Sequence, residues 1–265
     1  MNFSAYVEGI GVLGPGLEGW PEAAAILTDC RAYRSAATVL EAPALLPAAE
    51  RRRTGRVVKL AIGIGLEATR QAGMNPADLP SVFSSSGADG HNCHEICLAL
   101  AAASREISPT RFANSVHNAA AGYWSIATGS MCASNVLCAF DASFGAGLLE
   151  AVAHVCVERE PVLLAAYDSE YPQPLHAKRP IPEAFGIALV LASEQRSSSI
   201  ARIAISMTES ASDTLVEPQL EALRLSIPAA RGLPLLRQLA LREHGRTTLD
   251  YLDDTRLAIE VSPCR

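Results

Sequence analysis

The stretch Arg111–Glu150 reads RFANSVHNAAAGYWSIATGSMCASNVLCAFDASFGAGLLE and contains the pattern that decides the fold. Small residues follow Asn118 and predict the start of a helix. A short apolar run, Asn135–Phe140, ends at Asp141, which opens a second helix. α/β proteins often place their chemistry where a strand ends on a polar residue at a helix N-terminus, because unpaired backbone N–H groups and the helix dipole meet there. We therefore look for the functional site at this turn.

The composition predicts a folded protein with a sizeable core. The chain has 265 residues, 49% of them hydrophobic and 19% charged, which suffices for one large domain or two small ones. Its net charge of −6 gives no sign of a nucleic-acid or anionic-membrane partner. Met1–Gly11 lacks a basic leader and an apolar signal core, and we expect no membrane span. The seven cysteines are scattered and show no spacing typical of a disulfide framework, which favours reduced thiols. We therefore expect a cytoplasmic protein.

Strands and helices alternate along the chain, which predicts an α/β fold. Ala5–Leu13 has the pattern of an apolar strand, and Pro47–Ala72 is the clearest long helix because apolar residues recur at helical spacing. Further strands are expected over Val82–Ser85, Pro161–Ala166, Glu183–Ala192, Ala201–Met207 and Leu257–Val261. Further helices are expected over Trp20–Leu27, Cys93–Ala103, Glu217–Leu225 and Leu233–His244.

Taken in order, these segments resemble the amino-terminal half of the β-ketoacyl synthases of the thiolase superfamily. VEGIGVLGPG is similar to the family's opening strand and KLAIGIGLEATRQAG to its first long helix. HNAAAGYWSIATG resembles the N-x-x-A-G helix before the catalytic turn, and RPIPEAFGIALVLASEQ a later hairpin. The resemblance covers about Ala5 to Met207. The combination of GYWSIATG with FGAGLLEA is most similar to short synthase-like proteins of aryl-polyene-type pathways, which accompany a complete synthase and are described as chain-length-factor-like.

The resemblance implies an α/β, thiolase-like half: a mixed sheet of five-strand type with helices on both faces, lacking the second synthase half. We expect residues 1–207 to form the synthase amino-terminal-like domain. Residues 208–265 should add two helices and a strand packed on the same domain. A complete synthase buries one face of this half against the other half, so here the tail after Met207 or a partner should cover it.

The family's catalytic cysteine is absent from its expected position. Family members carry it at the strand-to-helix turn in a T-A-C pattern, where the helix N-terminus favours the thiolate. Counted without gaps from Gly122, this position falls on Asp141, whose carboxylate cannot carry a growing chain as a thioester. Asp141 is expected foremost as a helix N-cap, which would still let it face the remnant of the pocket.

A rival register places the nucleophile at Cys132, because Met131-Cys132-Ala133-Ser134 superficially resembles the family signature. This register deletes the strand that should present the cysteine, so the motif lacks its structural context. With Cys132 or Cys138 as nucleophile, the protein would be an active β-ketoacyl synthase or acyltransferase. The resemblance also implies two catalytic histidines from the second half, whereas the tail contains only His244, which we expect to interact with a helix C-terminus.

We therefore interpret the chain as a catalytically silent chain-length factor that pairs with an active β-ketoacyl synthase in polyketide, aryl-polyene or fatty-acid-like biosynthesis. We expect an obligate dimer, either a heterodimer with a complete ketosynthase or a homodimer, and neither a cofactor nor a metal. The remnant of the acyl tunnel is expected, from position alone, at Asn118, Phe140, Asp141 and Phe144. An acidic acyl carrier protein would dock on Arg52, Arg53 and Arg56.

A hypothesis from another class is a metal or small-ligand module at His91–Cys97. This segment contains His91, Cys93, His94 and Cys97. On a helix Cys97 shares a face with Cys93 or His94, but the four side chains do not all converge. No second pair at zinc-site spacing occurs elsewhere in the sequence.

Overall fold

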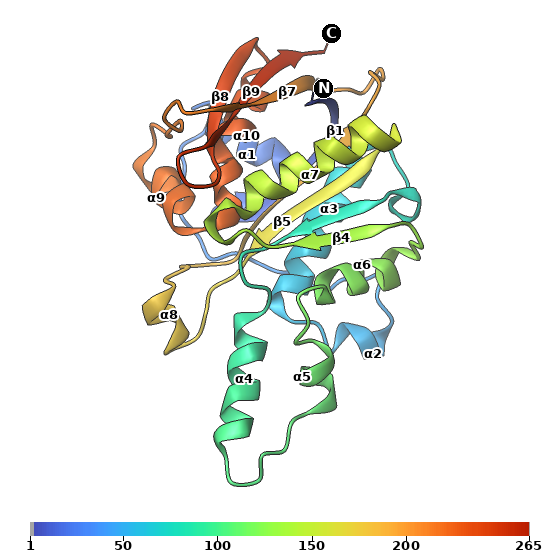
Figure 1. Ribbon diagram of the computed structural model, residues 1–265, viewed down its shortest axis with the longest axis vertical. Coiled ribbons are helices and arrows are strands. Elements are labelled where there is room, and N and C mark those ends of the chain that lie inside the picture. Colours follow the sequence, from blue (N-terminus) through green and yellow to red (C-terminus); the bar gives the residue numbers. More distant parts are fainter. Residues whose placement is uncertain (1–2, 265) are drawn as a thin grey trace.

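The computed structural model describes residues 3–264, and these form one nine-stranded mixed sheet with helices on both faces (Figure 1). The strand order is β4-β3-β5-β6-β1-β7-β9-β8, with the short β2 beside β1. β3 pairs in parallel with β4 and β5, and the other pairs are antiparallel. The strands are β1 (Phe3–Gly14), β2 (Leu17–Glu18), β3 (Ser81–Ser84), β4 (Ser134–Leu137), β5 (Val162–Asp168), β6 (Phe185–Ala192), β7 (Ala201–Thr208), β8 (Gly245–Asp250) and β9 (Arg256–Pro263).

Two helical layers cover this sheet. α1, α7 and α10, together with the 3-10 segment η3, pack on one face, and α3 and α6 pack on the other. The helices are α1 (Trp20–Leu27), α2 (Ala48–Arg51), α3 (Arg56–Ala72), α4 (Gly90–Ala101), α5 (Pro109–Ala113), α6 (Ala119–Thr128), α7 (Ser143–Glu158), α8 (Leu175–Lys178), α9 (Pro218–Ser226) and α10 (Leu233–Leu241). Three 3-10 segments are η1 (Pro76–Asp78), η2 (Phe140–Ala142) and η3 (Pro228–Gly232).

β5 shows why the sequence supports this layering. Leu164 and Ala166 belong to the core on the α7 face, whereas Leu163 and Ala165 belong to the core on the α3 face. Successive side chains of a strand point to opposite faces, so a strand buried on both sides needs an uninterrupted apolar run. The expected α/β class, with a mixed sheet between helices, is confirmed.

The tail enlarges the sheet beyond the expected five-strand type. β9 pairs with β7 along its whole length, from Ala201 opposite Pro263 to Thr208 opposite Arg256, and β8 adds the next strand. The expected helix Leu233–His244 ends at Leu241, because Arg242 adopts a left-handed conformation at φ 53°, and Gly245–Asp250 then forms the unexpected strand β8. The division of the chain at residue 207 stays a prediction.

The expected helix Pro47–Ala72 is interrupted. α2 ends at Arg51, and α3 begins at Arg56 after a break that contains Gly55. A Cβ atom on Gly55 would lie 2.3 Å from the Asp89 carboxylate, so the chain approaches the start of α4 here. Helical periodicity in the sequence does not reveal such a tertiary contact.

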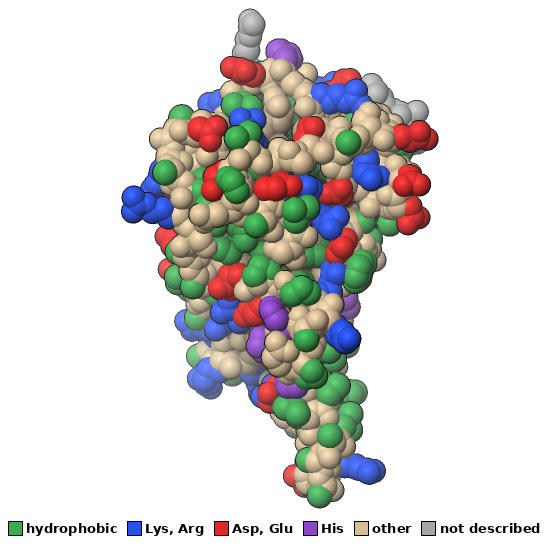
Figure 2. Space-filling model, turned by 90° about the vertical axis from the view of Figure 1, so that its left-hand side faces the viewer, with side chains coloured by type: hydrophobic (Ala, Val, Ile, Leu, Met, Phe, Trp, Pro, Cys, Tyr) green, Lys and Arg blue, Asp and Glu red, His purple; other side chains and the backbone are tan. Residues whose placement is uncertain are grey.

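α4 and α5 form a projecting hairpin, residues 90–113, which we call the arm. It leaves the sheet after β3 and extends past the β4 edge (Figure 1). Of the α4 residues, all of them described, Gly90 and Asn92 are buried, and Asn92 Nδ2 donates to Arg111 O at 2.8 Å. Phe112 is 68% exposed and Leu98 53%, and Figure 2 shows hydrophobic side chains along this protrusion. The arm thus presents apolar surface that the rest of the described chain leaves uncovered.

One stretch among residues 3–264, Phe140–Glu158, is long and apolar enough to cross a membrane by length and composition. Half of it is buried, and α7 packs on β3, β5 and β1. This packing accounts for its apolar composition, since a core helix of a folded domain passes the same test.

Candidate functional site

The candidate site lies where the carboxyl ends of the parallel strands β3, β4 and β5 meet. Ser85 and Ser86 follow β3, the turn at residues 138–142 follows β4, and Asp168 is the last residue of β5. In α/β sheets the carboxyl ends of parallel strands form the usual binding crevice. The strand-to-helix turn expected from the sequence is therefore present at the expected place.

The turn itself has a strained backbone. Phe140 adopts φ 52°, a left-handed conformation that is rare for a bulky residue. The Ser143 hydroxyl fixes the turn, because Ser143 Oγ accepts from Ala139 N at 3.1 Å and donates to Phe140 O at 2.7 Å. The expected N-cap role of Asp141 is wrong, since no side chain caps η2 or α7 and the Asp141 carboxylate turns elsewhere.

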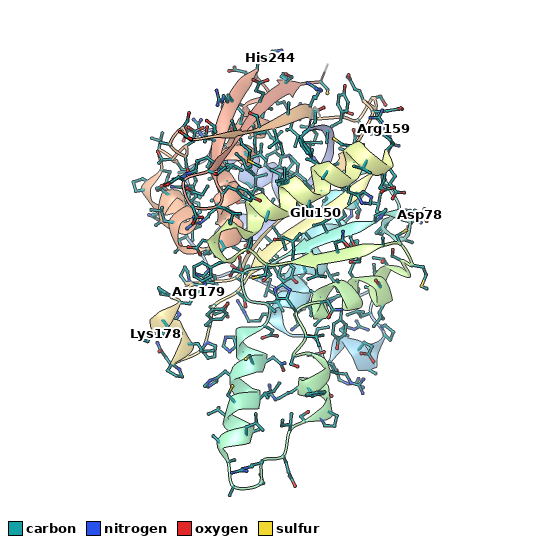
Figure 3. The ribbon with its side chains drawn as sticks, viewed as in Figure 1. Asp78, Glu150, Arg159, Lys178, Arg179 and His244 are labelled. Carbon is teal, nitrogen blue, oxygen red and sulfur yellow. The ribbon has the colours of Figure 1, made fainter. Side chains whose placement is uncertain are left out.

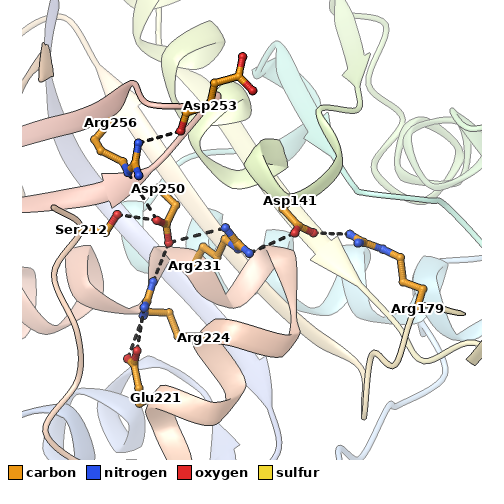
Figure 4. Close-up of polar contacts among 9 residues, drawn as sticks. All are labelled: Asp141, Arg179, Ser212, Glu221, Arg224, Arg231, Asp250, Asp253 and Arg256. Carbon is orange, nitrogen blue, oxygen red and sulfur yellow. Dashed lines mark hydrogen bonds and ion pairs between the residues drawn. The ribbon is translucent and has the colours of Figure 1, made fainter. Parts of the chain in front are cut away.

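Asp141 binds two arginines instead. Its Oδ1 atom accepts from Arg179 Nη2 at 2.6 Å, and its Oδ2 atom accepts from Arg231 Nη2 at 3.2 Å (Figure 4). The Arg179 guanidinium also lies 3.7 Å from the centroid of the Phe140 ring, a cation–π contact. Asp141 thereby joins the turn to the β5–β6 connection and to the tail. The expected capping role follows from the local sequence alone, whereas in the structure Asp141 pairs with arginines that are distant in the chain.

Alternating charges continue from Arg231 into the tail (Figure 4). Arg231 Nη1 lies 3.7 Å from Asp250 Oδ2, which accepts from Arg224 Nη1 at 2.7 Å. Arg224 also binds Glu221, and this hydrogen bond lowers the pKa of the Glu221 carboxyl. Burial opposes ionisation of Asp250, but the Ser212 hydroxyl and the two arginines together lower its pKa. Asp141 is thus one end of an extended ion-pair chain.

Asp168 is a buried carboxylate that the sequence reasoning missed. It accepts from Ser86 N at 2.8 Å, Ser86 Oγ at 2.6 Å and Ala229 N at 2.9 Å. Burial raises the pKa of Asp168 to about 6, although these hydrogen bonds and Arg179 favour the charged form. The residue ties η3 and the loop after β3 to the end of β5. An apolar strand that ends on an aspartate, the pattern used for Asp141, could have revealed it.

The two candidate thiols lie at different ends of β4. Cys132 precedes the strand, and its Sγ donates to Ala77 O at 3.6 Å, so it lies away from the Asp141 turn. Cys138 follows the strand, and its Sγ donates to Ser86 O at 3.3 Å. Cys132 therefore lacks the strand–turn–helix context of a family nucleophile, whereas Cys138 shares the end of the sheet with Asp141.

The four residues expected in the tunnel remnant have different environments. Phe140, 61% exposed, and Asp141 adjoin at the turn. Asn118 is exposed at the start of α6, where its side chain makes no capping hydrogen bond. Phe144 is 1% exposed and packs against Gly232 of η3, so it belongs to the core. The structure brings Phe140 and Asp141 together at the surface and places Phe144 beneath them.

The three arginines expected to dock a carrier protein differ in their contacts within the chain. Arg56 is engaged within the domain, with Nε 2.7 Å from Glu170 and Nη2 2.6 Å from Glu183. Arg53 pairs with Glu50 of α2 at 3.1 Å, and Arg52 is exposed in the break between the helices. Arg52 and Arg53 remain accessible to a partner, and carrier-protein docking stays a prediction.

The His91–Cys97 segment forms part of α4. Cys93 and Cys97 are exposed neighbours, and burial together with Cys97 raises the pKa of the Cys93 thiol. No group of three or more His, Cys, Asp or Glu residues within residues 3–264 is arranged to hold a metal ion. The segment therefore offers no metal-binding set.

The mixed sheet, the helices on both faces and the strand-to-helix turn define a thiolase-like half-domain of the ketosynthase type. The chain belongs to the family described as β-ketoacyl synthase, N-terminal domain, whose family model matches residues 20–237. The family resemblance seen in the sequence is thereby confirmed. No curated protein matches the chain.

Several solved ketosynthase structures share this fold. The complex of the ketosynthase ApeO with its chain length factor ApeC from Xenorhabdus doucetiae is 23% identical, with a TM-score of 0.73 over 97% of this chain and 99% of that chain. The ishigamide ketosynthase/chain length factor is 12% identical, with a TM-score of 0.71 over 97% and 98%. The AntDE:AntF complex, a type II acyl carrier protein with its ketosynthase, is 10% identical, with a TM-score of 0.76 over all of both chains.

Proposed function

We propose that this chain is a catalytically silent ketosynthase-like subunit, a chain-length factor, that pairs with an active β-ketoacyl synthase. Polyketide, aryl-polyene or fatty-acid-like biosynthesis is the expected setting. The observation that carries the proposal is Asp141, which lies in η2 at the strand-to-helix turn. Counted without gaps from Gly122, Asp141 stands where the resemblance expects the family's cysteine. A carboxylate held by Arg179 and Arg231 cannot accept an acyl chain as a thioester.

The two edges of the sheet differ in a way that supports a partner beside β4. At the β8 edge, Asp213 N donates to Thr248 O at 2.8 Å and Asp213 Oδ2 accepts from Thr248 N at 3.0 Å, which blocks strand addition. β4 pairs with β3 and with no other strand of the described chain, and Ser134 and Asn135 are exposed. A strand from another subunit therefore fits best at β4.

The arm supports the same location. It extends past the β4 edge, so a subunit that pairs with β4 would lie beside it (Figure 1). Its exposed apolar side chains would then be covered, which offsets the cost of leaving them in water. These side chains are Leu98, Leu100 and Phe112, with Val116 just after α5.

Co-expression with the ketosynthase encoded nearest to this chain tests the proposal. We expect a heterodimer that elongates acyl-carrier thioesters, with condensation largely intact in Asp141→Ala, Cys132→Ala and Cys138→Ala. Condensation or decarboxylation of malonyl-carrier protein by this chain alone, abolished in Cys132→Ala or Cys138→Ala, would make it an enzyme and refute the proposal.

A surface pair of variants tests the partner site. Phe112→Asp places a charge on the arm, and we expect co-purification with the ketosynthase to fall at least about tenfold. Val216→Asp is the matched control, because Val216 is 85% exposed but lies in the tail before α9. Equal co-purification of both variants would exclude the arm from the interface.

A further inference from the structure

The arm leaves the sheet through a short turn, residues 85–89, between β3 and α4. Ala88 in this turn adopts φ 53°, a left-handed conformation that residues with a side chain seldom adopt. Its N–H group donates to Ser85 Oγ at 3.2 Å, and the Asp89 carboxylate caps α4 by accepting from Asn92 N at 2.9 Å. Such a conformation persists only where neighbouring groups hold it. The direction in which α4 leaves the sheet therefore depends on what packs against this turn.

Tyr171, which follows β5, fills a notch that one glycine of the turn and one of α4 leave open. A Cβ atom on Gly87 would collide with the Tyr171 hydroxyl oxygen, and a Cβ atom on Gly90 would collide with the edge of the Tyr171 ring. Neither glycine has a positive φ, so the backbone conformation does not itself require glycine at these positions. The ring also packs against the core on the α7 face of the sheet. Tyr171 thereby joins the start of the arm to the core.

The end of β5 and the residues after it bind the same turn by polar contacts. The Asp168 carboxylate accepts from Ser86 N at 2.8 Å and from Ser86 Oγ at 2.6 Å. Glu170 Oε1 lies 3.8 Å from His91 Nε2 in the first turn of α4. Residues 168–171, which we call the bracket, thus contact both the turn and the start of α4.

The contacts farther along the arm join its two helices to each other. Asn92 Nδ2 donates to Arg111 O at 2.8 Å, and Arg111 Nη2 lies 3.2 Å from Glu95 Oε2. The returning chain is tied to the domain at Asn114, whose Nδ2 atom donates to Arg53 O at 2.9 Å. The outgoing helix α4 packs chiefly on α5, so within the described chain the bracket is its main attachment to the sheet.

We infer that Tyr171 is a positioning residue, which sets the direction of the arm and thereby the place of the apolar side chains that a partner would cover. The inference rests on the proposed function, because the arm is there assigned to the partner interface. The connection between β5 and β6 continues through α8 to Lys178 and Arg179 (Figure 3). Arg179 Nη2 lies 2.6 Å from Asp141 Oδ1 in the turn after β4. One connection, residues 169–184, therefore contacts both the base of the arm and that turn.

Hydrogen–deuterium exchange of the purified full chain tests the inference at α4. We expect Tyr171→Ala to raise the exchange rate of the first turns of α4 at least about tenfold, since the notch is then empty. Tyr171→Phe keeps the ring and should exchange like the wild type. Tyr33→Ala is the matched control, because Tyr33 is partly buried against the same core but lies beside Gly16 in the β1–β2 turn. Equal exchange at α4 in Tyr171→Ala and in Tyr33→Ala would overturn the inference.

A double variant separates this role from a general loss of stability. Gly90→Ala alone should also raise the exchange rate at α4, because the added methyl group would collide with the Tyr171 ring. In the Tyr171→Ala background the same substitution should have no further effect, since the ring that it would strike is gone. An equal effect of Gly90→Ala in both backgrounds would mean that the ring and the glycine do not act on each other, and would overturn the inference.

Co-expression with the ketosynthase encoded nearest to this chain tests the consequence for the partner. We expect co-purification to fall at least about tenfold in Tyr171→Ala and to be retained in Tyr171→Phe and Tyr33→Ala. Undiminished co-purification of a Tyr171→Ala chain whose α4 exchanges faster would overturn the inference while the proposed function stands. Failure of the wild-type chain to co-purify would refute the proposed function, and the exchange at α4 would still decide whether Tyr171 holds the arm.

Discussion

Replacing Asp141 with cysteine tests the electrostatics of the turn. The new thiol would lie beside Arg179 and Arg231, whose guanidinium nitrogens are 2.6 and 3.2 Å from the present carboxylate oxygens. The Asp141 side chain is 40% exposed, so the interaction of two charges here is close to its value in water. In water, two opposite unit charges about 4 Å apart attract by about 1 kcal/mol. Two pairs give about 2 kcal/mol in favour of the thiolate, or about 1.5 pH units at 1.36 kcal/mol per unit. We expect the thiol pKa to fall from about 8.5 to about 7.

The assay is the pH dependence of iodoacetamide alkylation at position 141, with Cys132 and Cys138 replaced by serine. Asp78→Cys in the same background is the matched control, because Asp78 is exposed and bonds to Asn75 rather than to an arginine. The control thiol should titrate near about 8.5. If both thiols titrate at the same pH, the two arginines do not act on position 141 and the reasoning is refuted.

Three stability predictions concern the described core. Burial raises the pKa of Asp168 to about 6 from 3.8, so the native state retains a proton that the unfolded state loses. The stabilisation from protonated Asp168 is fully present below pH 3.8 and is lost as the pH rises to about 6, which lowers the free energy of unfolding by about 3 kcal/mol. Urea unfolding at several pH values should show this fall. The variant Asp168→Asn, which cannot ionise, should abolish it. In the same assay, Arg224→Ala should lower the free energy of unfolding by about 3 kcal/mol, because the carboxylates of Glu221 and Asp250 lose an arginine that is only 5% exposed. The peripheral Arg256→Ala should lower it by less than about 1 kcal/mol. Gly11→Ala should lower the thermal midpoint of unfolding, since its Cβ would lie 2.1 Å from a backbone oxygen of α3. The added Cβ of Gly63→Ala would meet no atom within 4 Å, so this variant should stabilise the protein by about 0.5–1 kcal/mol. Equal effects of the two variants would refute the packing argument.

The sequence predicts β5 and β6 clearly because these two strands are buried on both faces. β5 and β6 read as apolar runs, and the turn after β4 was found from a run that ends on a polar residue. β8 was missed because GRTTLD has no apolar alternation and resembles the end of a helix. Its strand conformation comes from pairing with β9, in which Thr248 lies opposite Ala258. Strand propensity depends on such neighbours, which a single sequence does not reveal.

The sequence predicts that Asp141 lies at the strand-to-helix turn, but not what its side chain contacts. Asp141 was placed at the turn by local pattern, but its partners lie 38 and 90 residues away in the chain. Nothing local distinguishes Arg179 or Arg231 from the other arginines. Asp168 shows the same limit, because the donor from Ala229 is 61 residues distant. Local rules find where a polar group stands, whereas the fold decides what it binds.

These contacts explain how the turn after β4 holds its shape. A bulky residue at φ 52°, as at Phe140, persists only where its surroundings hold it. Here Ser143 fixes the backbone, Arg179 stacks on the Phe140 ring, and Asp141 links that arginine to Arg231. An alanine at position 141 would remove the carboxylate that Arg179 and Arg231 share, whereas the aspartate lets one side chain join three segments. The turn therefore depends on its one charged residue to connect it to the β5–β6 connection and to the tail.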